Sequence, residues 1–311
     1  MMPAPKNPGP RGTLRHDEPM ARHTSWRAGG PARTFYEPAD IADLSAFLRA
    51  LPAGEPVFWL GLGSNLLVRD GGLQATVIAT AAMLKRIERD APDLVRAEAG
   101  VPCAKVARFC ARNGLRGAEF LAGIPGTVGG ALAMNAGAFG GETWACVAAV
   151  ETVDRHGEVR VRPPGDFRVA YRSVAGPPGE WFLAAHLRLT PGAGRAGSAR
   201  IRELLARRSA TQPTGQASCG SVFRNPPGDH AARLIEAAGL KGTCIGAACV
   251  STKHANFIVN TGGARAADIE ALIRLVADTV ARTQGVRLEP EVRIVGEPVP
   301  GATPLQEGER P

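Results

Sequence analysis

The most regular pattern along the chain is a stripe of apolar residues in its final third. The stripe falls at positions i, i+3, i+4, i+7 and i+11 and consists of Ile269, Leu272, Ile273, Val276 and Val280. Because residues at this spacing share one face of an α-helix, the stripe predicts a strongly amphipathic helix. Weaker patterns of the same kind predict helices at 41–51, 105–113, 198–209 and 230–239.

Short apolar runs bounded by turn residues predict β-strands elsewhere. The segment 145–162 is typical of two strands joined by a turn at His156 and Gly157. Another apolar run, at 56–60, leads into a loop interrupted by glycines. Helices and strands are therefore mixed throughout, which predicts the α+β class with at least two, and we expect three, folded units. Further strands are predicted at 181–189, 254–260 and 292–296.

Segments without apolar periodicity mark the expected limits of these units. Residues 210–218 read ATQPTGQAS, a polar linker that is the best candidate for a domain boundary. Residues 1–20 are rich in proline, glycine and charged side chains, and residues 298–311 have a similar composition. We therefore expect both ends to be flexible tails.

The overall composition is that of an ordinary globular protein. The chain has 311 residues, of which 44% are hydrophobic and 21% are charged, and this excludes intrinsic disorder as its main state. Lys and Arg number 37 against 29 Asp and Glu, which gives a net charge of +8. Such an excess of positive charge favours a polyanionic partner, either nucleic acid or a phosphorylated small molecule. The composition alone does not distinguish a nucleic acid from a phosphorylated small molecule as the partner.

Cysteine spacing and hydropathy predict the compartment. The six cysteines contain no C-x-x-C pair, and their spacing fits neither a zinc site nor a disulfide framework, so we expect no metal. Scattered thiols of this kind are typical small buried side chains of a reducing cytoplasm. The first residues lack the apolar core of a secretion signal, and no run of about 18 apolar residues occurs. We therefore expect a cytoplasmic protein without membrane insertion.

Two glycine-rich loops are candidates for phosphate binding. The first glycine loop spans 61–65 and contains Gly61, Gly63, Ser64 and Asn65. Glycine lets consecutive backbone N–H groups form a concave nest for phosphate oxygens, although each loop alone also fits a plain turn. A Rossmann site is not indicated, because the first loop lacks a third glycine and 66–71 does not open a helix. The second glycine loop, 123–130, offers Gly123, Pro125, Gly126, Thr127, Gly129 and Gly130.

Around these loops the chain resembles the UDP-N-acetylenolpyruvoylglucosamine reductases. The resemblance is carried first by WLGLGSNLLVRDGGL at 59–73 and by GIPGTVGGALAMNAGAFGGE at 123–142. One such motif would be a weak signal, whereas many in the family's order, from about residue 23 to 296, are highly specific. The other matching segments are 24–32, 171–173, 220–226, 238–242, 253–260 and 289–296.

The resemblance implies a flavoprotein fold of the vanillyl-alcohol-oxidase type rather than a Rossmann fold. In this α+β fold, FAD lies between two subdomains and the glycine loops hold its pyrophosphate. A third, C-terminal α+β domain binds the UDP-sugar. We accordingly expect FAD subdomains at 21–84 and 85–195, and a substrate domain at 210–297.

The resemblance also implies a reaction of peptidoglycan synthesis. The family reduces the enolpyruvyl ether of UDP-N-acetylglucosamine to UDP-N-acetylmuramate, and NADPH reduces the FAD and leaves before the sugar nucleotide binds. Hydride then adds to the terminal carbon of a carboxylate-conjugated alkene, and negative charge collects on the carboxylate. Such a site needs a cation or hydrogen-bond donors for that charge and a proton donor for the adjacent carbon.

Three residues match the family's catalytic positions. Arg172 would hold the developing enolate with a permanent charge in two-point geometry. Ser221 matches the proton donor. Glu291 matches a carboxylate near the enolate, which we expect to be protonated or to relay a proton, because an ionised group there would repel the enolate. Chemistry alone favours plainer interpretations, namely solvated charges for Arg172 and Glu291 and a turn hydroxyl for Ser221.

Four further residues match positions of the family's substrate pocket. Tyr171 is one of only two tyrosines, and it would otherwise be a packing residue at a strand end. Arg224, Asn225 and Lys241 match residues that line the UDP-sugar site, where cations offset the diphosphate charge. For these three, ordinary solvation at the surface is the alternative interpretation.

One departure from the family and two rival functions stay open. The segment that follows Arg172, residues 173–180, is short, as in the type of this family that lacks a substrate-covering loop. Another flavin oxidoreductase with the same cofactor fold is the nearest rival. A basic nucleic-acid-binding protein is the second, but aromatic residues are only 5% and the basic residues are dispersed, so we expect no nucleic acid partner.

Overall fold

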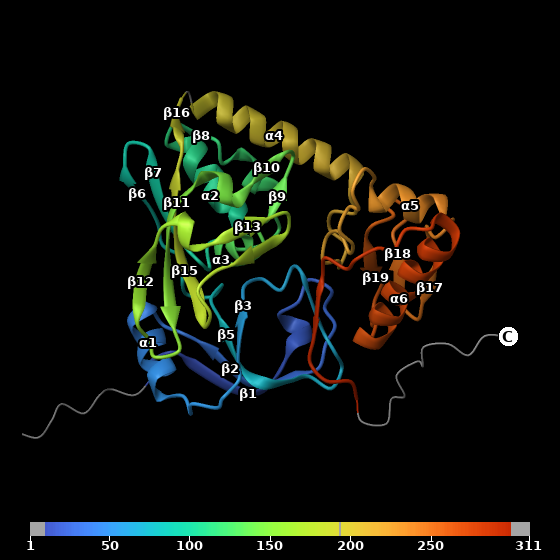
Figure 1. Ribbon diagram of the computed structural model, residues 1–311, viewed down its shortest axis with the longest axis horizontal. Coiled ribbons are helices and arrows are strands. Elements are labelled where there is room, and N and C mark those ends of the chain that lie inside the picture. The colour runs from blue at the N-terminus through green and yellow to red at the C-terminus, as the bar shows by residue number, and fades with distance from the viewer. Residues whose placement is uncertain (1–9, 193, 300–311) are drawn as a thin grey trace, which may run out of the picture. The chain divides into compact units, whose positions relative to one another are not determined.

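Two units, each with its own core, make up the described part of the chain. The structure is a computed structural model that describes residues 10–192 and 194–299 (Figure 1). Both units are assembled from segments far apart in the sequence. Among the described residues, unit 1 contains 10–16, 34–64 and 75–214, and unit 2 contains 17–33, 65–74 and 215–299.

A five-stranded antiparallel sheet lies at the centre of unit 1, in the strand order β12-β11-β15-β7-β6. Strands β11 and β12 form the hairpin predicted from 145–162, and Gly157 takes a φ of 73° at its turn. The strand predicted at 181–189 is also confirmed, as β15. The strands are β6 (Ile87–Ala91), β7 (Leu94–Glu98), β11 (Val147–Asp154), β12 (Val159–Arg162) and β15 (Glu180–Arg188).

The largest core cluster of unit 1 contains residues of three helices. Helix α2 (Cys103–Arg112) buries Val106 and Cys110, and helix α4 (Gly194–Thr211) lies alongside it (Figure 1). Helix α3 (Val128–Ala133) packs against β15. The helices predicted at 105–113 and 198–209 are thus confirmed. Short strand pairs surround them: β8 (Leu115–Arg116) with β16 (Thr190–Pro191), β9 (Gly137–Ala138) with β10 (Gly141–Glu142), and β13 (Arg168–Ala170) with β14 (Ser173–Ala175).

The N-terminal part of the chain forms a second sheet with the strand order β1-β2-β5-β3. The tail expected at 1–20 is wrong for Thr13–Pro19, which form β1, while residues 1–9 lie outside the described residues. Strand β1 lies at the sheet edge and exposes most of its side chains, so its polar sequence looks like that of a tail. The other elements here are β2 (Pro31–Glu37), α1 (Ile41–Ala50), β3 (Val57–Leu60) and β5 (Leu73–Ala79).

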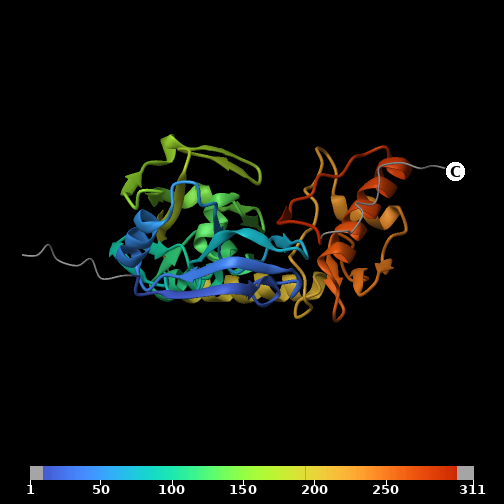
Figure 2. The ribbon, with the colours of Figure 1, turned by 90° about the horizontal axis from the view of Figure 1, so that it is seen from below.

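Unit 2 contains a three-stranded antiparallel sheet covered on one face by helix α6 (Figures 1 and 2). Helix α6 (Ala266–Gln284) buries Ile269, Leu272, Ile273, Val276 and Val280, so the predicted amphipathic helix is confirmed. The strand predicted at 254–260 is shorter than expected, because the preceding residues form a turn. The sheet consists of β17 (Cys244–Ile245), β18 (Ala248–Val250) and β19 (Ile258–Asn260), and α5 (Ala231–Ala237) contacts α6.

Early parts of the chain belong to the core of unit 2. Trp26 is fully buried, and its indole N–H donates to the carbonyl of Ile258 at 2.7 Å. Strand β4 (Leu66–Val68) pairs in parallel with β20 (Arg293–Val295). Residues 21–84, expected as one subdomain, are therefore divided between the two units. The change from unit 1 to unit 2 after Thr214 falls within the polar segment 210–218.

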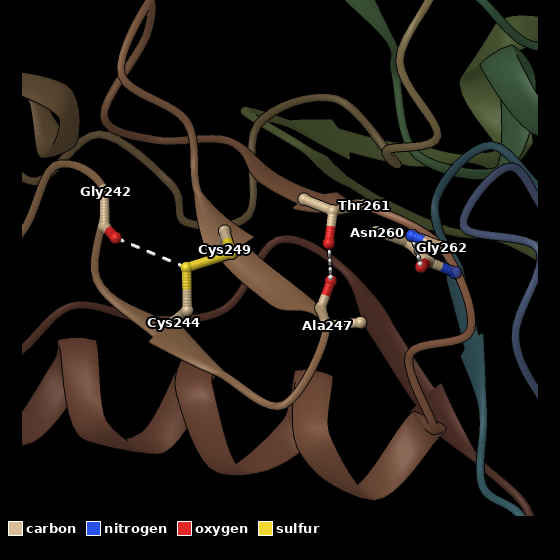
Figure 3. Close-up of a disulfide and its surroundings, with 7 residues drawn as sticks. All are labelled: Gly242, Cys244, Ala247, Cys249, Asn260, Thr261 and Gly262. Carbon is tan, nitrogen blue, oxygen red and sulfur yellow. Dashed lines mark hydrogen bonds between the residues drawn. A yellow bond between two sulfur atoms is a disulfide. The ribbon is translucent and has the colours of Figure 1, made fainter.

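One expectation about the cysteines is wrong. Cys244 and Cys249 form a disulfide across the β17–β18 hairpin (Figure 3), with Cα atoms 4.1 Å apart. The two residues are directly opposite in the strand register, and a separation of five residues in the sequence gives no sign of this pairing. The other cysteines are buried or partly buried thiols, as expected: Cys103, Cys110, Cys146 and Cys219.

Within 10–192 and 194–299, no helix is long and apolar enough to cross a bilayer. In the same ranges, no three His, Cys, Asp or Glu side chains are grouped so that they could hold a metal ion.

Candidate active site

Residues 61–64 of the first glycine loop lie close to the second glycine loop within unit 1. A Cβ atom added at Gly61 would lie 2.5 Å from Oγ1 of Thr127, and one added at Gly126 would lie 3.3 Å from Oγ of Ser64. Gly63 takes a φ of 60°, a conformation that favours glycine. Each loop therefore places a hydroxyl side chain against a glycine of the other loop, and a larger residue at Gly61 would collide with Thr127.

The second glycine loop leads directly into α3. Buried Thr127 begins this helix, and its side chain accepts the backbone N–H of Gly130 at 3.5 Å. Glycine is again required by the packing, since a Cβ atom at Gly129 would lie 3.0 Å from Cβ of Ala99. Pro125 and Gly130 are exposed. The glycines of both loops leave backbone N–H groups without a Cβ atom beside them, an arrangement that can bind phosphate oxygens such as those of the FAD pyrophosphate.

This packing gives a prediction for Gly61→Ala. We expect the variant to lose about 1 to 2 kcal/mol of unfolding free energy, because the new methyl group collides with the Thr127 hydroxyl. Thermal unfolding followed by circular dichroism measures the loss. Gly54→Ala is the control, since a Cβ atom there meets nothing within 4 Å. In a Thr127→Ala background, Gly61→Ala should cost much less, and an equal cost would show that the collision is not its cause.

Arg172 stands at the tip of the β13–β14 hairpin, where Ala170 pairs with Ser173. Its φ of 53° is left-handed, which costs a residue other than glycine about 1 to 3 kcal/mol. The guanidinium donates to the carbonyls of Gly137 at 3.1 Å and Asn135 at 3.4 Å, and lies 4.8 Å from the ring centre of Tyr171. A strained backbone and two hydrogen bonds thus hold a permanent charge beside an exposed aromatic ring.

Asn135 is a buried residue of this site that the sequence motifs did not identify as functional. It is 2% exposed and also has a left-handed backbone, with a φ of 45°. Its side-chain amide donates to Glu142 at 2.9 Å and to the carbonyl of Ala170 at 3.3 Å, and its Oδ1 accepts the N–H of Trp144 at 3.1 Å. The only available signal was its position inside the run 123–142, because an asparagine by itself indicates no chemistry.

Ser221 and Glu291 lie on neighbouring segments within unit 2. The backbone N–H of Glu291 donates to the carbonyl of Val222, the residue after Ser221, at 2.7 Å. The side-chain amide of Asn65, from the first glycine loop, donates to the carbonyl of Glu291 at 3.0 Å. Gly220 precedes Ser221 with a φ of 74°, which turns the chain at this point. Two of the three predicted catalytic residues are therefore brought close together in the chain's fold.

The residues predicted to bind the UDP-sugar also belong to unit 2. The Arg224 guanidinium lies 4.0 Å from the carboxylate of Glu289. Asn225 accepts the backbone N–H of the first α5 residue at 3.1 Å, so this side chain also supports the helix. Lys241 pairs with Glu236 at 2.6 Å. Tyr171, Arg172 and most of the glycine-loop residues belong to unit 1.

Two other reactive side chains nearby have structural surroundings. Burial raises the pKa of the Cys219 thiol to about 12, and its sulfur faces the carbonyl of Leu66 at 3.5 Å. Burial lowers the pKa of His254, whose ring packs against Phe257 with centres 4.7 Å apart. Both side chains therefore have the surroundings of packing residues rather than of a nucleophile or a base.

Family models match both parts of the chain. Residues 32–161 match an FAD binding domain, and residues 212–295 match the C-terminal domain of UDP-N-acetylenolpyruvoylglucosamine reductase. The FAD cofactor and the α+β flavoprotein fold expected from the sequence are thereby confirmed.

Curated proteins and a solved structure match nearly the full length of the chain. The UDP-N-acetylenolpyruvoylglucosamine reductase of Alkalilimnicola ehrlichii is 67% identical over 286 residues, which is 92% of this chain and 96% of that protein. That of Methylococcus capsulatus is 67% identical over 287 residues, covering 92% and 94%. The crystal structure of the reductase from Thermus caldophilus has a TM-score of 0.78 at 34% identity, covering 91% and 98%.

Proposed function

The chain belongs to the family of UDP-N-acetylenolpyruvoylglucosamine reductases, and we propose that it reduces the enolpyruvyl ether of UDP-N-acetylglucosamine to UDP-N-acetylmuramate in peptidoglycan synthesis. The observation that carries this proposal is 67% identity over 92% of the chain to a reductase of that name. NADPH is the proposed source of electrons. The NADPH and UDP-sugar substrates favour the cytoplasm as the place of action.

The glycine loops support FAD binding, and bound FAD, once reduced by NADPH, would supply a hydride to the terminal carbon of the enolpyruvyl group. Gly61, Gly63 and Ser64 from one loop, and Gly126 and Thr127 from the other, would hold the pyrophosphate. The close approach of Gly61 to Thr127 supports this role, since it brings a glycine of one loop and a hydroxyl group of the other to the same place. The remaining candidates are Asn65, Gly123, Pro125, Gly129 and Gly130.

Arg172 is the proposed partner of the substrate carboxylate. As electrons move onto that carboxylate, a guanidinium in a fixed position stabilises the enolate more than the ground state, and this lowers the barrier. Its left-handed backbone and its two carbonyl partners support the role, because strain of this kind is typical of functional sites. The stacked Tyr171 would contact the substrate at the same place.

Ser221 and Glu291 are proposed to deliver the proton that completes the reduction. The Ser221 hydroxyl would donate to the carbon next to the enolate carboxylate, and Glu291 would remain protonated or pass the proton on. The hydrogen bond between Glu291 and Val222 supports a joint action, since it places the two residues on adjacent segments. Arg224, Asn225 and Lys241 are proposed to bind the UDP-sugar, and the short segment 173–180 favours an enzyme without a substrate-covering loop.

An anaerobic mixing experiment tests the function. The flavin of the purified protein is reduced with NADPH, and the enolpyruvyl ether of UDP-N-acetylglucosamine is then added in a stopped-flow instrument. The visible flavin absorbance should return as the sugar is reduced. UDP-N-acetylglucosamine without the enolpyruvyl group is the control and should leave the flavin reduced. A flavin that stays reduced with both sugars would favour another flavin oxidoreductase, and a colourless protein would exclude a flavoenzyme.

A further inference from the structure

Asn135 contacts the hairpin that carries Arg172 at two separate points. Its own carbonyl accepts a hydrogen bond from the Arg172 guanidinium at 3.4 Å. Its side-chain amide donates to the carbonyl of Ala170, two residues before Arg172, at 3.3 Å. One residue therefore restrains both the backbone that leads to Arg172 and the charged end of its side chain.

Asn135 is itself held in place by two further hydrogen bonds of its side chain. Its Oδ1 accepts the backbone N–H of Trp144 at 3.1 Å, and its Nδ2 also donates to the carboxylate of Glu142 at 2.9 Å. The side chain is 2% exposed, so these bonds are shielded from water. A buried amide with this many partners has a fixed orientation, and it transmits that orientation to Arg172.

The backbone conformation of Asn135 aims its carbonyl at the guanidinium. A φ of 45° is accessible to asparagine and glycine but costly for most other residues. The same conformation leads into Gly137, whose carbonyl is the second acceptor of the Arg172 guanidinium, at 3.1 Å. Asparagine is suited to this position because it adopts the conformation and supplies the amide as well.

We infer that Asn135 is the positioning residue of Arg172 and presets the guanidinium for the substrate carboxylate. The inference rests on the proposed function, since it assigns Asn135 a role through Arg172. Of these two residues only Arg172 touches the substrate in this scheme, and Asn135 limits the directions in which the guanidinium can point. Loss of that restraint should slow the step in which the enolate forms, because a displaced charge stabilises it less.

The test compares Asn135→Gly and Arg172→Gly, alone and together. Glycine keeps the left-handed backbone at either position and removes only the side chain. We expect Asn135→Gly to slow flavin reoxidation by the enolpyruvyl sugar between about 10- and 100-fold, with flavin reduction by NADPH unchanged. Arg172→Gly should slow the same step by about 100-fold or more. The double variant should be no slower than Arg172→Gly alone, because Asn135 acts only through Arg172.

The outcomes separate the inference from the proposed function. If Arg172→Gly slows reoxidation but Asn135→Gly does not, or if Asn135→Gly slows the Arg172→Gly protein further by the same factor, Asn135 does not position Arg172. If Arg172→Gly itself has no effect, the proposed role of Arg172 is wrong and the inference is overturned with it. Exposed Asn113, at the end of α2, supplies the control Asn113→Gly, which should stay within about twofold of the wild-type rate.

A second variant, Asn135→Asp, tests the inference if Asn135→Gly does not fold. Asn135→Asp keeps the Oδ1 acceptor of Trp144 but replaces the Nδ2 donor to Ala170 and Glu142 with an oxygen. It should slow reoxidation in the same range while the flavin spectrum stays that of the wild type. A wild-type rate in this variant would also overturn the inference.

Discussion

Ser221→Ala is expected to slow reoxidation of the reduced flavin by the enolpyruvyl sugar by about 10²- to 10⁴-fold, the usual contribution of a positioned acid. Removal of the hydroxyl leaves the enolate without its proton donor, while the hydrogen bond between Glu291 and Val222 uses only backbone atoms and stays intact. Reduction of the flavin by NADPH should remain near the wild-type rate. Stopped-flow absorbance under anaerobic conditions measures both half-reactions on the same protein.

Ser218→Ala is the matched control for this variant. Ser218 is also partly buried and lies three residues earlier on the same segment, and no role is proposed for its hydroxyl. Its removal should change neither half-reaction by more than about twofold. An equal loss of both half-reactions in Ser221→Ala would instead assign Ser221 a structural role, and an unchanged reoxidation rate would exclude it as the proton donor.

Arg96→Met is expected to lower the unfolding free energy of the protein by about 3 kcal/mol. Arg96 makes two hydrogen bonds of 2.7 Å to Glu151, and it also lies 3.5 Å from Glu98 and 3.6 Å from Glu88. The Arg96 and Glu151 side chains are only 15% and 13% exposed. Methionine fills much of the space but removes the positive charge that Glu151, Glu98 and Glu88 share. Urea unfolding at neutral pH measures the loss.

The same pair predicts a dependence on pH. The hydrogen bonds from Arg96 lower the pKa of Glu151 in the folded protein, so its contribution to stability is complete only above the unfolded pKa, about 4.3. The contribution is lost as the pH falls through the lower, folded pKa. The stability difference between the wild type and Arg96→Met should therefore shrink in acid. Arg188→Met on β15 is the control, since Arg188 is 70% exposed and should contribute at most about 1 kcal/mol.

A difference that stays constant from neutral pH to below about pH 4 would show that Arg96 contributes by packing rather than by charge. If Arg188→Met lost as much unfolding free energy as Arg96→Met, burial would not explain the contribution of the Arg96 ion pairs.

The elements that the sequence predicted correctly are those with a local pattern. Helix α6 has an apolar stripe along its whole length, and the β11–β12 hairpin has a glycine at its turn. Which segments of the chain make up unit 2 was not predictable in the same way. Trp26 packs with residues more than 200 positions later in the chain, and such pairing leaves no periodic trace near Trp26 itself. Strand β1 was missed because an exposed edge strand is as polar as a tail.

The candidate site residues were predicted mainly from sequence motifs, because residue chemistry alone favoured plainer interpretations. The glycine loops were identified from their composition, but their approach at Gly61 and Thr127 depends on tertiary structure. Asn135 was missed because its importance lies in a backbone angle and in its contacts. Cys244 and Cys249 were missed because strand register, rather than spacing, decides whether two cysteines meet.

Unit 2 is built from early and late segments of the chain, and this sets an order for its folding during synthesis. Trp26 leaves the ribosome 232 residues before its partner Ile258. At about 5 to 20 residues per second, this delay is roughly 10 to 50 seconds. During that time the indole ring and strand β4 lack the partners that bury them in the finished protein. Unit 2 can therefore complete its core only when nearly the whole chain has been made, and chaperones have that interval in which to bind its early segments.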